Sequence, residues 1–224
     1  MIEFTKKFSV YFDNIKMDLE VISDISYNDD VIKMLINNGH EAMIEFGNIT
    51  VQFEVDRGVT HELVRHRLAS WAQESTRYVN YSKGKFGSEI TVINPEGAMI
   101  IDGMSEEQRK EMMKIWALAM ENAESSYMKA VSSNVKPQIA RQVLPNSVKA
   151  TINMSANYRE WRSFFKLRCA SDAHPSMRQV SIPLLKYLQQ RIPVIFDDIK
   201  CAPNTIKIND DGTMDTDVYA SIIY

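Results

Sequence analysis

Residues 49–55 alternate between apolar and polar side chains, which restricts the chain to folds that contain a half-buried β-strand. The apolar set is Ile49, Val51, Phe53 and Val55, and the polar set is Thr50, Gln52 and Glu54. A second strand is expected over residues 148–155, and two shorter ones over residues 8–12 and 18–22. Strands of this kind need other elements to cover their apolar face.

A long helix is expected in the middle of the chain. Ser105 and Gln108 match a capping box, and the apolar spacing that follows predicts an amphipathic helix as far as Tyr127. We interpret its apolar stripe as part of the core. The stripe consists of Met112, Met113, Ile115, Trp116, Ala119, Met120, Ala123 and Tyr127.

Shorter helices are expected on both sides of it. One covers residues 27–37, with Gly39 directly after its end, and another covers residues 60–68. Pro137 suits the first position of a short helix that ends before Pro145. Asn157 and Glu160 form an N-cap pattern that opens a helix to about residue 169. The last helix covers residues 175–191, with a disturbance at Pro183, and residues 69–85 are expected to be irregular.

These elements predict an α+β fold, of mixed α/β type, with a central mixed or antiparallel sheet flanked by long helices. No linker or repeat divides residues 1–224, so we expect a single domain. Cys169 and Cys201 form no CxxC pair, and no apolar run reaches the roughly 20 residues of a membrane span. Residues 1–7 show no signal-peptide core. We therefore expect a cytoplasmic protein with no membrane partner.

Basic residues are concentrated in two segments of a chain whose net charge is −3. Residues 57–85 hold six Lys or Arg against two acidic residues, and residues 136–191 hold ten against two. This distribution favours a local anion site, and arginine forks suit phosphate or the edge of a polar ring. A solvated basic face is the alternative.

The segment from Arg65 to Tyr78 is too polar for a buried strand and has no helical apolar face. Its varied donors suit a ligand with both a phosphate and a polar ring. Alternatively, Ser75 is a cap and Arg77 an ion-pair partner of Glu74. A zinc helix is excluded by spacing, because the second histidine comes one residue too late for the H-E-x-x-H pattern. We expect no metal site.

Four blocks of this sequence resemble, in the same order, those of the flavin-dependent thymidylate synthases. They extend over roughly residues 39–180. The blocks are Gly39-His40-Glu41; Arg65-His66-Arg67 with Ser75 after seven residues; Ala140-Arg141-Gln142-Val143-Leu144-Pro145; and Asn157-Tyr158-Arg159 continuing to Leu167-Arg168.

The resemblance implies the reductive methylation of dUMP to dTMP. Methylene-tetrahydrofolate would donate the carbon, and FAD reduced by NADPH would carry the hydride. This route needs no cysteine nucleophile, and neither cysteine here has a recognisable activating context. The resemblance also implies a homotetramer whose active sites are shared between subunits, with no nucleic acid as partner.

The resemblance implies specific site residues. The expected FAD contacts are His40, Glu45, Arg65, His66, Arg67, Gln73, Asn157, Arg159 and Ser163. The expected dUMP contacts are Glu62, Arg65, Gln73, Glu74, Ser75, Arg77, Arg141 and Arg168, with either Gln73 or Glu74 reaching the nucleotide. Arg168 corresponds to the arginine credited with polarising the uracil, a role that suits a fixed guanidinium beside developing negative charge.

Some positions depart from the commoner family pattern, and two other functions stay open. Gln73 stands where many members have Glu, Ala42 replaces a small polar residue, and Ser163 replaces Asn or His. One alternative is a nucleic-acid-binding module in which Trp71 and aromatic neighbours stack on bases. The other is a non-catalytic relative with the same fold. Ser75 lacks a nearby base in the sequence, which favours binding over nucleophilic catalysis.

Overall fold

The computed structural model describes residues 29–82, 89–202 and 219–223. Its sheet has four antiparallel strands in the order β2-β3-β1-β4. The strands are β1 (Asn48–Asp56), β2 (Ala69–Gln73), β3 (Lys149–Asn157) and β4 (Tyr219–Ile223). The predicted α+β class is confirmed. The strands expected over residues 8–12 and 18–22 lie outside the described residues.

The two long strands of the sheet, β1 and β3, alternate between buried and half-buried positions as predicted. Phe53 lies opposite Ile152 and Val51 opposite Met154, and all four side chains are fully buried. The opposite face is polar, where Gln52 donates a hydrogen bond to an Asn153 oxygen at 3.0 Å. Apolar burial therefore fixes the register, because a slip by one residue would turn the polar face inward.

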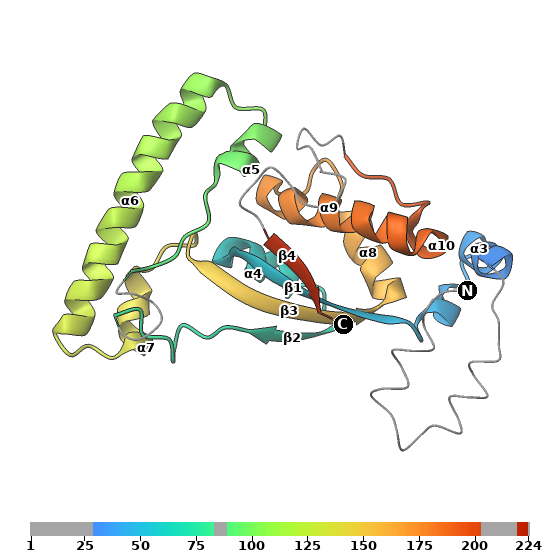
Figure 1. The fold of residues 1–224 in the computed structure, drawn as a ribbon, viewed down its shortest axis with the longest axis horizontal. Helices are drawn as coiled ribbons and strands as arrows, with labels where there is room; N and C mark the ends of the chain where they lie inside the picture. The colour runs from blue at the N-terminus through green and yellow to red at the C-terminus, as the bar shows by residue number, and fades with distance from the viewer. Residues whose placement is uncertain (1–28, 83–88, 203–218, 224) are drawn as a thin grey trace, which may run out of the picture.

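Two helices, α8 (Tyr158–Arg168) and α9 (Pro175–Arg191), lie on one side of the sheet (Figure 1). β3 runs directly into α8 at Asn157, whose side-chain oxygen accepts a hydrogen bond from the Glu160 N–H at 2.9 Å. Trp161, Phe164 and Phe165 fill the space beneath the helix and are fully buried. Both helices were predicted, and α9 continues through its internal proline.

Short helices complete the periphery. Gly39, at φ +74°, follows α3 as the predicted glycine, in a conformation that side chains rarely adopt. No described helix is long and apolar enough to span a membrane. The short helices are α3 (Asp29–Asn37), η1 (Glu41–Ile44), α4 (Arg57–Leu63), α5 (Glu96–Ile101), α7 (Pro137–Ala140), η3 (Arg141–Val143) and α10 (Pro193–Phe196).

The long helix α6 (Glu106–Ser132) begins with the predicted capping box at Ser105 and projects away from the sheet (Figure 1). Among its residues only Tyr127 is buried, packed edge-on against Tyr81 in a small second core. Met112 is 40% exposed and Ile115 57% exposed. The prediction that this stripe is core is therefore only partly right for the single chain. Other members of the stripe, such as Met113 and Trp116, are half-buried, and the Trp116 indole N–H donates to the Ser147 hydroxyl at 3.1 Å.

Two other predictions need correction between residues 57 and 73. The helix expected over residues 60–68 is α4, which begins at Arg57 because the Asp56 side chain caps it, accepting a hydrogen bond from the Val59 N–H at 2.8 Å. Residues 69–73, expected to be irregular, form strand β2 at the edge of the sheet. An edge strand tolerates this polar composition, because only its alternate residues turn toward the core.

Candidate active site

The guanidinium of Arg168, the last residue of α8, is held by three hydrogen bonds. Its Nη1 donates to the Glu62 carboxylate at 2.9 Å, and its Nη2 donates to the Glu62 carbonyl oxygen at 2.9 Å. Its Nε donates to Nε2 of His66 at 3.0 Å. Glu62 belongs to α4 and His66 follows that helix, so the two basic segments of the sequence meet at this point.

His66 lies between Arg168 and a buried carboxylate. Its Nε2 accepts from Arg168, so the neutral ring carries its proton on Nδ1, which donates to Glu160 Oε1 at 3.2 Å. Burial, and then the positive charge of Arg168, lowers the pKa of His66 from 6.5 to about 4. Burial also raises the pKa of Glu160. The imidazole is therefore neutral at physiological pH.

The segment between α4 and β2 is anchored by side chains on both sides of it. The Trp71 indole N–H donates to the His66 carbonyl oxygen at 3.1 Å, and the Gln73 amide donates to the hydroxyl of buried Thr60 at 3.0 Å. These bonds fix the turn in which His66 points inward. The side chains of Arg65 and Arg67, on either side, are exposed and have no hydrogen-bond or ion-pair partner within the described part of the chain.

Residues after β2 bring the second basic segment alongside the first. The Glu74 N–H donates to the Thr151 carbonyl oxygen at 2.9 Å, and Arg141 donates to the hydroxyl of Thr76 at 3.2 Å. Ser75 lies at the start of this turn, and its hydroxyl accepts a hydrogen bond from the backbone N–H of Arg77 at 3.3 Å. The Arg77 guanidinium is exposed and lies over the neighbouring tyrosine ring, so it is accessible to an anion.

A third group of predicted residues lies at the opposite end of α8. Arg159 pairs with Glu45 at 2.6 Å, and both side chains are exposed. His40 and Ser163 are also exposed, whereas the Asn157 side chain is engaged as the helix cap. A helix rises about 1.5 Å per residue, so Arg159 and Arg168 are about 13 Å apart along the axis. The structure therefore does not bring this group to the Arg168 cluster within one chain.

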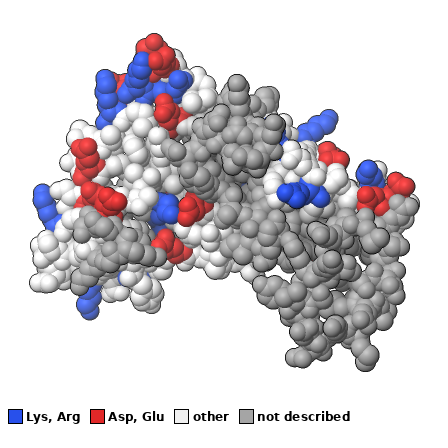
Figure 2. Space-filling model, in the orientation of Figure 1, with Lys and Arg blue, Asp and Glu red and all other residues white. Residues whose placement is uncertain are grey.

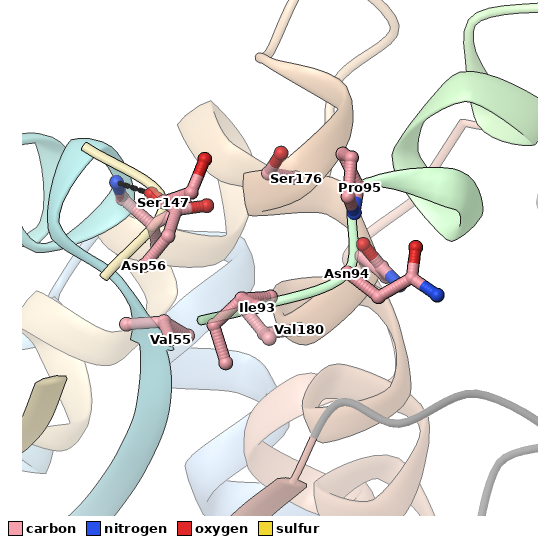
Figure 3. Close-up of a pocket in the computed structure, with 10 residues that line it drawn as sticks. Val55, Asp56, Ile93, Asn94, Pro95, Ser147, Ser176 and Val180 are labelled. Carbon is pink, nitrogen blue, oxygen red and sulfur yellow. Dashed lines mark hydrogen bonds between the residues drawn. The ribbon is translucent and has the colours of Figure 1, made fainter. Parts of the chain in front are cut away.

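Two pockets lie outside all of these groups. The first, shown in Figure 3, lies between Asp56 and Ser147 on one side and Asn94, Pro95 and Ser176 on the other. Its volume of about 40 Å³ holds only a few water molecules. The second is lined by residues of α3 and by residues from Pro193 to Asp198. Neither pocket is lined by a predicted site residue, so neither is the site that the sequence predicts.

On the face shown in Figure 2, basic and acidic residues lie among one another. Acidic and basic side chains gather together near the first turns of α6, where Lys110 pairs with Glu106. The described residues in this view form no continuous basic track. A nucleic-acid backbone needs such a track, so this face offers no support for the nucleic-acid alternative.

Sequence reasoning missed two partners within α8. Glu160 was assigned only to the N-cap, although residues 160, 164 and 168 share one helix face by their spacing of four. Arg162 belongs to the second basic segment, for which a solvated face was the alternative, but its side chain is buried. Both of its terminal nitrogens donate to the Asp198 carboxylate, at 2.6 and 2.7 Å, and its Nε donates to Glu41 at 3.3 Å. No pattern in the sequence identifies these acids as its partners.

Comparison with known proteins identifies the family. The family model described as "Thymidylate synthase complementing protein" (Thy1) matches residues 5–194. The flavin-dependent thymidylate synthase of Pyrococcus furiosus is 32% identical over 184 residues, which cover 81% of this chain and 69% of that protein. The flavin-dependent thymidylate synthase of Pyrococcus horikoshii is 31% identical over 194 residues, covering 84% and 76%.

A bacterial relative gives the same result. The flavin-dependent thymidylate synthase of Geobacter sulfurreducens is 28% identical over 191 residues, which cover 85% of this chain and 75% of that protein. The resemblance found in the four sequence blocks is thus confirmed over most of the chain. This chain belongs to the Thy1 family, the family of the flavin-dependent thymidylate synthases.

Proposed function

We propose that this protein catalyses the reductive methylation of dUMP to dTMP, using methylene-tetrahydrofolate as carbon donor and FAD reduced by NADPH. Its family membership supports the reaction. The observation in the structure that carries the proposal is the fixed guanidinium of Arg168 where the two basic segments meet. Cys169 lacks the features of a nucleophile, because it is buried and burial raises the pKa of its thiol to about 12.

Arg168 has the donors that uracil activation needs. Each of its terminal nitrogens carries two hydrogens, and the bonds to Glu62 use one on each. Two N–H groups are left for the edge of a uracil ring. A guanidinium held in place there favours negative charge on the pyrimidine, which makes C5 more nucleophilic. We assign Arg168 as the catalytic residue and Glu62 as the substrate-site residue that orients it.

Other residues predicted for the nucleotide lie on strand β2, in the turn that follows it and at the start of η3. Arg77 is exposed and suits the phosphate, and Arg141 lies beside the same turn through Thr76. Ser75 and Gln73 complete the set as hydrogen-bonding groups. Gln73 donates its amide to Thr60, which leaves its oxygen as an acceptor, while Glu74 stays the alternative at this position.

The residues predicted for the flavin fit a polyanionic dinucleotide. Arg65 and Arg67 present guanidiniums that no described residue pairs with, and Arg159 lies in the first turn of α8, where the helix dipole adds positive charge. Asn157 would act through its capping of that helix, and the other expected contacts are His40, Glu45 and Ser163. When bound, reduced FAD supplies the hydride; the protein binds it, orients it and excludes water.

We further propose that residues 1–224 form one catalytic domain that works as a homotetramer in the cytoplasm. Two observations support shared sites: the predicted flavin residues are divided between the two ends of α8, and α6 exposes apolar side chains, such as Ile115, along its length. Burying them against another subunit would be favourable. The free thiols suit a reducing compartment.

The decisive experiment measures dTMP formation from dUMP, methylene-tetrahydrofolate and NADPH, with and without FAD. We expect a yellow protein that forms dTMP only when flavin is present, and that releases tritium from dUMP labelled at C5. A colourless protein that binds DNA or RNA in a salt-sensitive way would instead support the nucleic-acid module. A flavin-loaded protein without turnover would identify a non-catalytic relative.

A further inference from the structure

One face of α8 carries three residues at intervals of four: Glu160, Phe164 and Arg168. The imidazole of His66 lies along this face. Its ring packs edge-on against Phe164 at 5.0 Å between centroids, and its two nitrogens bond to the residues on either side of that phenylalanine. The ring is therefore held at three points, and it links a carboxylate in the first turn of α8 to the guanidinium at the end of the helix.

The donor and acceptor roles in this chain of contacts follow from the chemistry of its two ends. The Nε of Arg168 has one hydrogen and no lone pair to offer, so the nitrogen it faces must accept. A neutral imidazole that accepts at Nε2 carries its hydrogen on Nδ1. That hydrogen points at Glu160, which is acceptor-only when ionised. Each group thus determines the state of the next.

Glu160 has no competing structural duty. The helix cap is formed by the Asn157 side chain and the Glu160 backbone N–H, so the carboxylate is not needed there. It is 8% exposed, and His66 is its hydrogen-bond partner in the described structure. A carboxylate in such a position is costly unless it is paired, which indicates that its contact with His66 matters to the molecule.

We propose that Glu160 is a positioning residue for the reaction: it keeps the proton of His66 on Nδ1, so that Nε2 can hold the Arg168 guanidinium in its catalytic orientation. The inference rests on the proposed function of Arg168. Without the carboxylate, the His66 proton is free to occupy Nε2, where it would face the Arg168 Nε–H as a second donor. The guanidinium would then keep only its bonds to Glu62.

The first test compares Glu160→Leu with Glu160→Gln. The glutamine oxygen can accept the same Nδ1–H, whereas leucine cannot accept any hydrogen. Losing an orienting partner of this kind typically costs about 10- to 100-fold, so kcat of Glu160→Leu should fall by that factor with little change in KM for dUMP and with FAD retained. Glu160→Gln should stay within about threefold of wild type. Equal losses in both variants would overturn the proposal.

A control and a double-mutant cycle separate positioning from general loss of structure. Glu124→Leu removes another partly buried carboxylate, one that accepts the Ile90 N–H at 2.8 Å, and should leave kcat nearly unchanged. If kcat fell as far in this control as in Glu160→Leu, the proposal would fail. In an Arg168→Lys background, Glu160→Leu should have little further effect. If the fold-losses in kcat of the two single variants multiplied in the double variant, Glu160 would act independently of Arg168.

The second test does not depend on turnover. NMR of protein labelled with ¹⁵N at its four histidines should show the Nδ1–H tautomer for His66 in the wild type. The Nε2–H tautomer should appear in Glu160→Leu. An Nε2–H tautomer in the wild type would overturn the proposal even if dTMP forms. Conversely, a wild type with the expected tautomer but without dTMP formation would refute the proposed function alone.

Discussion

The helices α8 and α6 both carry apolar stripes, but they differ in how much of the stripe the chain buries. Six of the 11 residues of α8 are buried between the sheet and neighbouring segments, whereas only Tyr127 is buried among the 27 residues of α6. α8 follows β3 directly, and Asn157, the last residue of β3, caps its first turn. α6 projects away from the sheet (Figure 1) and contacts the rest of the described chain along one face only, through residues such as Trp116 and Tyr127. An apolar period therefore identifies a buried face without telling which chain buries it.

The largest expected effect concerns Arg168, the last residue of α8, to which we assign the catalytic role. We predict that Arg168→Ala lowers dTMP formation about a thousandfold, because it removes the donor that stabilises charge on the uracil. Flavin content should stay close to that of the wild type. Steady-state turnover and the flavin spectrum of the same sample test this. Normal turnover would show that Arg168 does not polarise the substrate.

A second test measures how much the buried face of α8 contributes to stability. Phe165 is fully buried, and Phe165→Ala should lower the free energy of unfolding by about 3–5 kcal/mol. Leu167, on the same helix, is 60% exposed, and Leu167→Ala should change it by less than about 0.5 kcal/mol. Urea unfolding of both variants gives the difference. Similar losses would mean that α8 does not pack as described.

A third test asks whether another subunit covers α6. Ile115→Glu places a charge in the middle of the exposed stripe, and we expect the assembly to dissociate while the helix content of the chain is preserved. Burying one such side chain is worth about 1.5–3 kcal/mol at each interface. Light scattering after gel filtration measures the mass, with Lys114→Glu as the control. An unchanged assembly in Ile115→Glu would exclude this face from the interface.

The smallest expected effect concerns the buried imidazole beside α8. The pKa of His66 is about 4 in the folded chain, against an ordinary value of 6.5, because of burial and the charge of Arg168. Between these values the unfolded chain binds a proton that the folded chain does not. The stabilisation is therefore complete above pH 6.5 and is lost as the pH falls to about 4.

This pH-dependent loss should be at most about 3 kcal/mol, because one unit of pKa shift corresponds to about 1.4 kcal/mol. It should be absent in His66→Gln, which keeps Glu160 and Arg168 as the charged groups that face this position. Urea midpoints of the two proteins at a series of pH values measure the difference. Parallel curves would mean that His66 is charged in the folded protein.

Much of the fold was predictable from local patterns. The alternation around Phe53, the capping box at Ser105 and the cap at Asn157 all act within a few residues, and each was found where it was predicted. β2 was missed because the pattern of an edge strand depends on its neighbour, β3. For the site, the motif around Arg65 identified the family, but the roles assigned to individual residues stay predictions.

The sequence by itself determined most of the long elements, the family and the two basic segments, because spacing and motif are local properties of the chain. Only the tertiary structure decided what those side chains meet. It made Glu160, which was expected only as a capping residue, the partner of His66, and it left part of the α6 stripe exposed. The physical reason is that the position of a residue in the helix or strand repeat sets the direction of its side chain. The partner of that side chain can come from a segment about a hundred residues away, which only tertiary packing brings near.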